Sequence, residues 1–261
     1  MITKANPLNI NLNEFPQELY SYFQNTNVYD SSCSKDATVL YINSGYYLKI
    51  SDKDSLKNEY LNTKWFNSKG LSAEVIKYIS FNNKDYLLTK EAPGKTCLHF
   101  LNEPIQLCKA LASILHKIHS LPIEDFPVKT RIDDYILLAE TNYNKSLYDD
   151  HVLLPRFNIN SREEAWELVQ KNKHKLKRDT VIHGDFCLPN ILLNEKLELS
   201  AIIDVGNAGI GDKHIDLFWA VWSLNYNLKT DKYTECFLNA YGKDNFDYEM
   251  LRVIAAFEVF G

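Results

Sequence analysis

The stretch from Val181 to Ala220 constrains the fold of this chain more than any other. Two apolar residues that read as a short strand lead directly into His183-Gly184-Asp185. Asn190 follows shortly afterwards, and an apolar hairpin then ends at Asp204-Val205-Gly206. Gly-Asp is a common turn pair, so the first triplet alone predicts little. All of these elements in this order, with strand-like segments between them, are hard to obtain by chance and predict a functional site.

Protein kinases use the same spacing of acid, amide and acid. Their catalytic Asp lies five residues before a metal-binding Asn, and a second metal-binding Asp opens a D-x-G turn after a hairpin. In phosphoryl transfer one carboxylate orients the attacking hydroxyl, while an amide oxygen and a second carboxylate hold Mg²⁺ against the phosphates. On this basis we predict that Asp185 is catalytic and that Asn190 and Asp204 are Mg²⁺ ligands.

The same segments carry a family resemblance. HGDFCLPNILL followed by IIDVGNAGIGDKHIDLFWA resembles the aminoglycoside phosphotransferase family and, within it, the 3'-phosphotransferases. The resemblance implies a bilobal, protein-kinase-like α+β fold, with an antiparallel sheet and one helix in the N-terminal lobe and a mostly helical C-terminal lobe. It also implies ATP, with GTP possible, as the donor and the 3'-hydroxyl of an aminoglycoside antibiotic as the acceptor, an activity that gives antibiotic resistance.

Lys49 and Glu59 are the predicted phosphate-binding pair of the N-terminal lobe. Two β-rich runs, residues 37–42 and 46–50, flank Asn43-Ser44-Gly45 and predict a hairpin whose second strand carries Lys49. Glu59 follows in a helical pattern, placed to orient Lys49 by an ion pair. The alternative for Lys49 is an edge-strand lysine that faces water. Tyr47 points to the same side of the strand, and the resemblance implies that its ring stacks on adenine.

Two further nucleotide contacts follow from the resemblance. Ser34 lies in a Ser-rich run that would be the phosphate-facing loop, although a plain polar loop is an equal alternative. Backbone groups of the linker between the lobes would bind the adenine edge, and by position these belong to Lys90 and Ala92. Pro93-Gly94 marks the boundary. We therefore expect a nucleotide-binding lobe at residues 1–92 and a catalytic, acceptor-binding lobe at residues 93–261.

The C-terminal lobe is expected to be helical. Residues 104–119 begin with Pro and repeat apolar residues at helical spacing, and residues 130–150 and 161–177 also look helical. A metal pair formed by His116 and His119 is possible, but packed or solvated histidines are favoured because no third ligand is visible. Asp216 is expected to fix loop backbone and to cap the helix that begins near it.

The predicted acceptor is a small molecule. Only about a dozen residues separate Asp204 from the helix near Asp216, and no A-P-E segment is present, so the peptide platform of protein kinases is missing. Glu258 and Phe260 match the short acidic and aromatic tail that reaches the aminoglycoside pocket in the family. The alternative is that this segment is only the last helix, which packs its Phe residues.

The sequence also departs from the family pattern at its acceptor-binding positions. Asn207 stands where members often carry Arg after the D-x-G turn, and Trp219, Trp222 and Tyr226 stand where relatives show charged residues. Two alternatives therefore remain open. One is a kinase of another small hydroxyl compound, such as choline, homoserine or a sugar-like substrate. The other is a non-catalytic nucleotide-binding protein, against which the intact acid and amide set argues.

Composition excludes several other partners. The net charge of −5 gives no electrostatic case for nucleic acid. Five cysteines without a C-x-x-C pair indicate a reducing cytosol, and no apolar run is long enough to span a membrane. We expect a cytoplasmic monomer or weak dimer whose partner is a small-molecule acceptor.

Overall fold

The computed structural model describes residues 6–33, 37–153 and 155–261. The chain divides into two compact units, the first formed by residues 1–93 with 201–206 and the second by residues 94–200 with 207–261. Strands dominate the first unit and helices dominate the second, which makes the chain an α+β protein. Within the described ranges, none of the helices combines the length and the apolar character needed to cross a bilayer.

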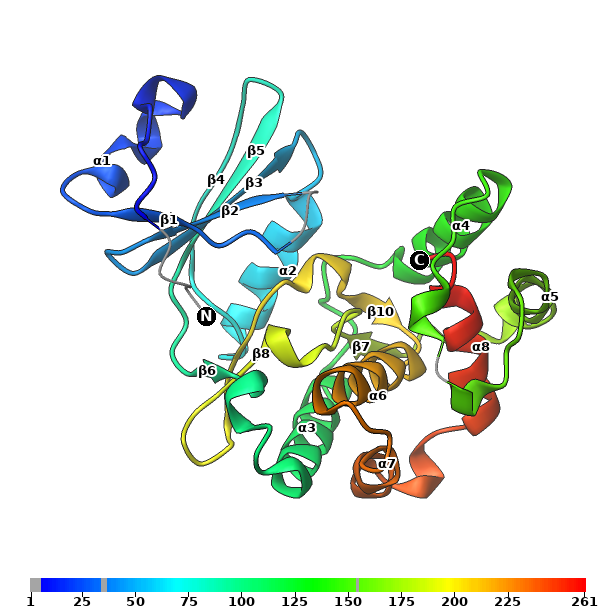
Figure 1. The fold of residues 1–261 in the computed structure, drawn as a ribbon. Coiled ribbons are helices and arrows are strands. Elements are labelled where there is room, and N and C mark those ends of the chain that lie inside the picture. Colours follow the sequence, from blue (N-terminus) through cyan, green and yellow to red (C-terminus); the bar gives the residue numbers. More distant parts are fainter. Residues whose placement is uncertain (1–5, 34–36, 154) are drawn as a thin grey trace. The chain divides into compact units, whose positions relative to one another are not determined.

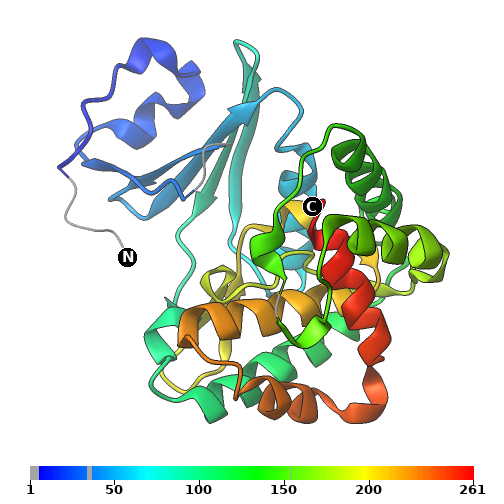
Figure 2. The ribbon, with the colours of Figure 1, turned by 45° about the vertical axis from the view of Figure 1, so that its right-hand side comes forward.

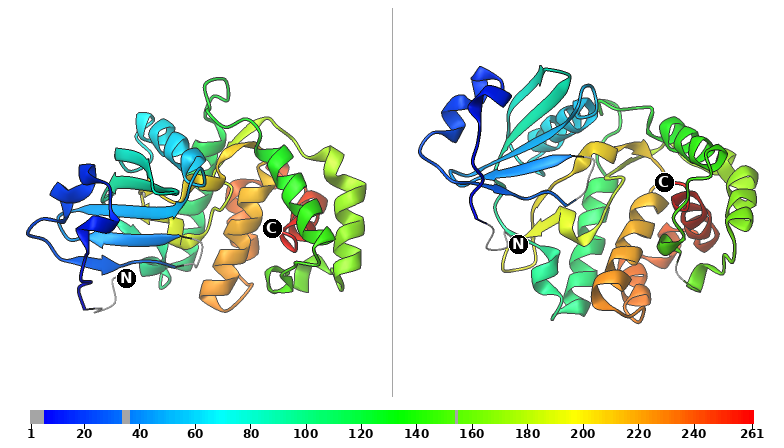
Figure 3. Two further views of the ribbon diagram at one scale, coloured as in Figure 1. Left: turned by 90° about the horizontal axis from the view of Figure 1, so that it is seen from above. Right: turned by 45° about the horizontal axis from the view of Figure 1, so that its top comes forward.

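A five-stranded sheet forms the first unit (Figures 1 and 3). Its strands are β1 Val28–Asp30, β2 Thr38–Ile42, β3 Tyr46–Asp52, β4 Val75–Phe81 and β5 Lys84–Lys90. They lie in the order β1-β2-β3-β5-β4, and every neighbouring pair is antiparallel. Lys49 is paired with Val39 on one side and Leu87 on the other. It therefore lies in the centre of the sheet, and the edge-strand alternative is wrong.

The two faces of this sheet have different roles. Leu40, Leu48 and Leu88 point to one face, where they form an apolar core with the N-terminal segment that contains α1 Tyr20–Phe23. Because side chains alternate along a strand, Lys49 points to the opposite face. Helix α2 Lys57–Ser68 supplies the partner of Lys49 from its buried side. The apolar alternation of β3 thus decides which way the lysine points.

Helices form most of the second unit (Figures 1 and 2). They are α3 Pro104–His119, α4 Arg131–Asn144, α5 Arg162–Asn172, α6 His214–Leu228, α7 Thr234–Tyr241 and α8 Tyr248–Glu258. Helix α3 packs on α7, while α8 packs on α5 and α6. The short strands β7 Thr180–Ile182 and β10 Gly209–Gly211 form an antiparallel pair, and β6 Lys95–Thr96, β8 Ile191–Leu193 and β9 Leu199–Ile202 form a three-stranded sheet.

The expected helices were too long in two places. Helix α4 ends at Asn144 instead of 150, and the chain reverses at Ser146 with a φ of 56°. Helix α5 ends at Asn172, and the basic segment Lys-His-Lys that follows forms a short 3-10 turn at residues 173–175 instead of a continuous helix to residue 177. Charged and polar residues are compatible with a helix but do not require one, so the composition of these segments did not predict where the two helices end.

Candidate active site

Three charged side chains meet in the first unit. The ammonium Nζ of Lys49 donates to Glu59 Oε2 at 2.7 Å and to Asp204 Oδ1 at 2.8 Å. Burial would lower the pKa of Lys49, but the charges of Glu59 and Asp204 outweigh it and raise that pKa, so the lysine stays charged. Burial raises the pKa of Glu59, while Lys49 opposes this shift. The structure therefore brings together three residues that the sequence analysis selected: the lysine, its orienting acid and a second acid.

Asp204 adopts an uncommon backbone conformation for a non-glycine residue, with a φ of 57°. Its side chain remains 52% exposed while Oδ1 accepts from Lys49. The following turn is held by α2, because Asn62 Nδ2 donates to the backbone oxygen of Val205 at 2.9 Å. Strained residues that surrounding contacts hold in place are frequent at ligand-binding sites. The arrangement presents a carboxylate that is fixed at its base and open to a ligand.

The other predicted nucleotide contacts are placed as follows. Tyr47 is half-buried, and its ring lies 5.0 Å from that of Tyr41, with burial and the charge of Glu91 raising its pKa to about 12. Lys90 ends β5, and its backbone N–H already donates to the oxygen of Glu74. Ala92 follows β5 and is half-buried. Ser34 lies outside the described residues. The roles of these four residues stay predictions.

The loop that carries Asp185 leaves the end of β7 in the second unit. Register pairs Ile182 with Gly209 of β10, so the loop begins from a fixed strand end. Gly184 has a φ of 83°, and a Cβ there would collide with the backbone carbonyl of Asn207. Only glycine fits this conformation and this close approach without strain. The His-Gly-Asp order is thus explained by the backbone path as well as by chemistry.

Asp185 and Asn190 are joined by side-chain hydrogen bonds. Asn190 Nδ2 donates to Asp185 Oδ2 at 2.9 Å and to the backbone oxygen of Asp185 at 3.0 Å. Both contacts use the amide nitrogen, which leaves the amide oxygen of Asn190 turned toward other ligands. The remaining carboxylate oxygen of Asp185 can accept from an acceptor hydroxyl. The local pair can therefore orient a nucleophile and hold a cation.

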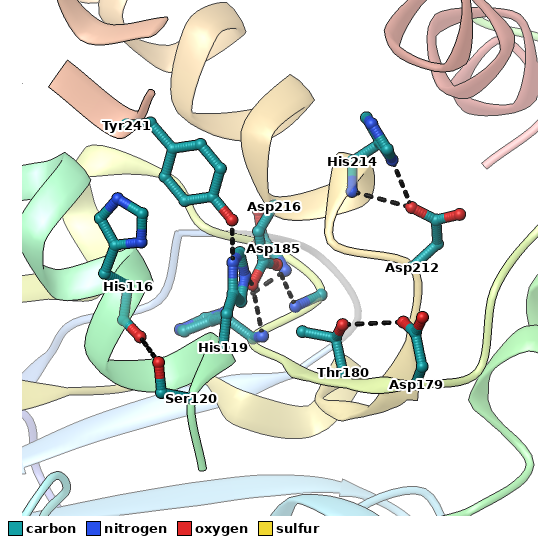
Figure 4. Close-up of polar contacts among 12 residues, drawn as sticks. His116, His119, Ser120, Asp179, Thr180, Asp185, Asp212, His214, Asp216 and Tyr241 are labelled. Atoms are coloured by element: carbon teal, nitrogen blue, oxygen red, sulfur yellow. Dashed lines mark hydrogen bonds and ion pairs between the residues drawn. The ribbon is translucent and has the colours of Figure 1, made fainter. Parts of the chain in front are cut away.

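Asp216, at the start of α6, binds the backbone of this loop through its carboxylate (Figure 4). Its carboxylate is fully buried and accepts from the backbone N–H groups of His183 at 2.8 Å and Gly184 at 2.7 Å. His119 Nε2 lies 3.1 Å from Asp216 Oδ2, and His119 Nδ1 lies 2.9 Å from the hydroxyl of Tyr241. With Nε2–H donating to the carboxylate, Nδ1 accepts from Tyr241. The expected loop-fixing role of Asp216 agrees with these bonds, but the expected helix cap is wrong, because the N-cap residue of α6 is Lys213 and no side-chain cap bond is made.

Sequence reasoning missed the second part of this network. The expectation of a packed or solvated histidine holds for His119, whose side chain is 6% exposed, but the ring also makes hydrogen bonds to Asp216 and Tyr241, which come from two later helices. His116 stacks on the Tyr241 ring at 4.4 Å instead of sharing a ligand with His119. No His, Cys, Asp and Glu group of metal-binding size occurs among the described residues. A helix-period pattern could show that His119 faces inward, but it could not name its partners.

Glu258 and Phe260 are buried at the C-terminal end of the second unit. Tyr135 donates to Glu258 Oε1 at 2.8 Å. Burial raises the pKa of Glu258 to about 7, opposed by the hydrogen bonds from Tyr135 and Trp219 and by Arg131, and supported by the charge of Asp185. Phe260 is fully buried and packs its ring edge-on against Tyr143 and Trp166. Their contact with an acceptor stays a prediction.

Similar proteins were found by family and by sequence. A model described as a phosphotransferase enzyme family matches residues 35–254. A probable aminoglycoside 3'-phosphotransferase of Lactococcus lactis is 39% identical over 266 residues, which cover all of both chains. An aminoglycoside 3'-phosphotransferase of Niallia circulans is 28% identical over 79% of this chain and 80% of its own.

Solved structures give the same fold. A crystal structure of a type VIII aminoglycoside 3'-phosphotransferase matches with a TM-score of 0.74 at 20% identity, over 94% of this chain and 97% of its own. A Streptomyces rimosus aminoglycoside phosphotransferase, in complex with ADP and streptomycin, matches with a TM-score of 0.73 at 19% identity, over 85% of this chain and 90% of its own. These neighbours confirm the predicted protein-kinase-like α+β fold.

Proposed function

Because the chain belongs to the phosphotransferase enzyme family, we propose that it transfers the γ-phosphate of ATP to the 3'-hydroxyl of an aminoglycoside. The observation that carries this proposal is the 39% identity to a probable aminoglycoside 3'-phosphotransferase over the full length of both chains. GTP remains a possible donor, since the family resemblance does not separate the two nucleotides. An aminoglycoside modified in this way would lose activity, which makes antibiotic resistance the proposed role.

Lys49 and Glu59 would hold the nucleotide phosphates. The Lys49 ammonium, kept charged by two carboxylates, can pair with α- and β-phosphate oxygens once Asp204 turns to another ligand. Glu59, on the buried face of α2, would hold the Lys49 ammonium in place by its ion pair when Asp204 turns away. Tyr47, Ser34, Lys90 and Ala92 remain the proposed contacts to the rest of the nucleotide.

Asp185 would position the acceptor hydroxyl. Phosphoryl transfer passes through a loose transition state that requires little early proton removal, so the main task of this carboxylate is orientation. Asn190 holds one carboxylate oxygen, and Asp216 fixes the backbone on the other side of the loop. Both contacts limit the motion of Asp185, and preorganisation of this kind lowers the cost of reaching the transition state.

Asn190 and Asp204 would each supply an oxygen ligand to Mg²⁺. The Asn190 amide presents its oxygen because its nitrogen is bound to Asp185, and the Asp204 carboxylate is half-exposed. Carboxylate and amide oxygens are the donors that a hard cation prefers. When bound, Mg²⁺ would neutralise negative charge on the phosphates.

The test compares Asp185→Ala with Asp179→Ala, which removes an exposed acid shortly before the same loop. With kanamycin, ATP and Mg²⁺, Asp185→Ala should lower ADP release by a factor of about 10³ or more, because the hydroxyl loses its orienting group. The Kd for ATP should change less than about threefold. Asp179→Ala should keep wild-type rates, and the product should carry one phosphate at the 3' position by NMR.

Two results would overturn the proposal. Full activity of Asp185→Ala would remove its assigned role. Wild-type protein that binds ATP but releases no ADP with kanamycin or neomycin, and instead turns over choline, homoserine or a neutral sugar, would keep the phosphotransferase and replace the acceptor. Expression in a susceptible bacterium, with kanamycin and neomycin in the medium, gives an independent readout of the proposed role.

A further inference from the structure

Asp85 is a buried acid of the first unit that the proposed chemistry does not use. It lies in β5 directly before the buried residues 86–88, and it has no exposed surface. Its Oδ2 accepts from the hydroxyl of Tyr78 at 2.8 Å, and its Oδ1 accepts from the hydroxyl of Ser80 at 2.6 Å. Burial of a carboxyl group is costly unless its oxygens are hydrogen-bonded, so these contacts explain how Asp85 is tolerated here but not what it does.

A further contact of Asp85 reaches the start of helix α2. Its Oδ2 also accepts from the backbone N–H of Leu56 at 3.3 Å. Leu56 is the N-cap residue of α2, and its apolar side chain cannot cap the helix. The first N–H groups of a helix have no partner within the helix, and an acidic side chain near them is stabilising. Asp85 therefore supplies from β5 the cap that the local sequence of α2 lacks.

The helix turn that Asp85 caps also carries Glu59. Glu59 follows Leu56 by three residues, and its Oε2 accepts from Lys49 Nζ at 2.7 Å. Lys49 pairs with Leu87, two residues after Asp85 in β5, so Lys49 and Asp85 point to the same face of the sheet. The sheet and the first turn of α2 are thus joined twice, by a strand acid that binds a helix N–H and by a helix acid that binds a strand lysine.

A ring stack strengthens the same attachment. Tyr60, next to Glu59 in α2, stacks on Tyr78 of β4, with the ring centroids 4.6 Å apart and the planes 9° from parallel. Because Tyr78 also donates to Asp85, the stack and the carboxylate belong to one network. Buried networks whose members are satisfied fix one arrangement of the elements that they join. A shift of α2 along its axis would have to break the stack and the hydrogen bond from Leu56 together.

We propose that Asp85 is a positioning residue for nucleotide binding, which holds the first turn of α2 where Glu59 can orient Lys49 toward the phosphates. The inference rests on the proposed function and deepens it, because it names a residue that acts through Glu59 and not by contact with the nucleotide. The alternative is that Asp85 only stabilises the first unit. A merely stabilising contact would leave the Kd of the folded protein for ATP unchanged.

The sign of the expected effect separates position from charge. Loss of a negative charge from the first unit would by itself favour an anionic nucleotide and lower the Kd for ATP. Loss of the α2 anchor would raise this Kd, because Glu59 would no longer hold Lys49 in one place. Asp85→Asn keeps an oxygen for the N–H of Leu56, and its N–H₂ group can donate to the hydroxyl of Ser80. Asp85→Leu and Asp85→Ala keep no acceptor.

Titration calorimetry with ATP and Mg²⁺, on proteins whose folding is checked by far-UV circular dichroism, tests the proposal. Asp85→Leu and Asp85→Ala should each raise the Kd for ATP about tenfold, whereas Asp85→Asn should stay within about twofold of wild type. Val28→Ala is the matched control, because it removes buried side-chain volume from the apolar core on the opposite face of the same sheet. It should lower stability but leave the Kd within about 1.5-fold of wild type.

The decisive readout is the coupling to Glu59. Glu59→Ala should itself raise the Kd for ATP about tenfold, and adding Asp85→Leu should change it by less than about 1.5-fold, because Asp85 acts only through Glu59. In steady-state ADP release with kanamycin, Asp85→Leu should raise the KM for ATP and leave the KM for kanamycin unchanged.

Each other outcome has a clear meaning. An unchanged Kd in Asp85→Leu and Asp85→Ala, an equal rise in Asp85→Asn, or an equal effect of Asp85→Leu with and without Glu59 would overturn the inference and leave the proposed function intact. Loss of folding in both Asp85→Leu and Asp85→Ala would assign Asp85 to stability alone and overturn the inference as well. If wild type binds ATP but turns over no aminoglycoside, the proposed function fails, and the same Kd series still decides the inference. Wild type that binds neither ATP nor GTP would overturn both.

Discussion

Asp204 in the first unit and Asp216 in the second are both acids that the proposed function uses, but their surroundings within their own units are opposite. The side chain of Asp204 is 52% exposed and accepts from Lys49. Asp216 has no exposed surface and accepts from two backbone N–H groups and from His119. One carboxylate keeps an oxygen open for a ligand, and the other uses its oxygens to hold backbone in place.

This difference predicts which substitution lowers the free energy of unfolding and which lowers mainly the activity. An ion pair open to solvent contributes little to the free energy of unfolding, because water and salt screen it. Removal of a buried carboxylate leaves its donor N–H groups unsatisfied inside the protein, and this lowers the free energy of unfolding. Substitution of Asp216 should therefore damage the fold, whereas substitution of Asp204 should damage mainly the chemistry.

Asp216→Asn is expected to give the largest loss of stability. The amide keeps one acceptor oxygen but turns an N–H₂ group toward donors, so the free energy of unfolding should fall by about 3 kcal/mol or more. Urea unfolding followed by far-UV circular dichroism at pH 7.5 measures the change. ADP release should fall as well, because the backbone of His183 and Gly184 loses its anchor. An unfolding free energy equal to that of wild type would break the contrast.

Glu258→Gln should remove a pH dependence that the second unit carries. Burial raises the pKa of Glu258 to about 7 from 4.5, so the folded state retains a proton that the unfolded state has already lost between these pH values. The contribution of this group to stability is full below pH 4.5 and declines as pH rises toward 7, by about 3 kcal/mol in total.

Urea unfolding from pH 5 to pH 8 tests this prediction. Wild type should lose stability relative to Glu258→Gln across the interval, and the difference between the two proteins should level off above pH 8. The hydrogen bond donated by Tyr135 survives in the variant, because the Gln oxygen can still accept from the phenol. Parallel curves for the two proteins would show that Glu258 is ionised throughout and would contradict the prediction.

The parts of the site that sequence could predict are those set by local chain geometry. Asp185 and Asn190 lie in one short loop, so their spacing alone implied that their side chains could meet, and they do at 2.9 Å. Alternation along β3 turned Lys49 away from the apolar core, and a helical pattern placed Glu59 within reach. The protein-kinase-like α+β fold was implied by the family resemblance that these motifs carry, not by chain geometry, and it is confirmed by its structural neighbours.

The remaining parts depend on contacts between distant segments. His119, Asp216 and Tyr241 come from three helices, and no local pattern indicates that their side chains form one network. The buried state of Glu258 depends on Tyr135 and Trp219 in the same way. Helix ends were also misplaced, because α4 stops where Ser146 reverses the chain and not where the polar composition changes.

Asp204→Asn is expected to give the smallest loss of stability. Asn tolerates the left-handed conformation that Asp204 adopts, and its oxygen can still accept from Lys49. The free energy of unfolding should therefore change by about 0.5 kcal/mol or less. ADP release should nevertheless fall about a hundredfold or more, because a neutral amide replaces the proposed charged Mg²⁺ ligand.

Raising the Mg²⁺ concentration should restore part of the rate in this variant but none in Asp216→Asn. A stability loss as large as that of Asp216→Asn would mean that Asp204 anchors the fold, and the distinction between an open and an anchoring carboxylate would fail.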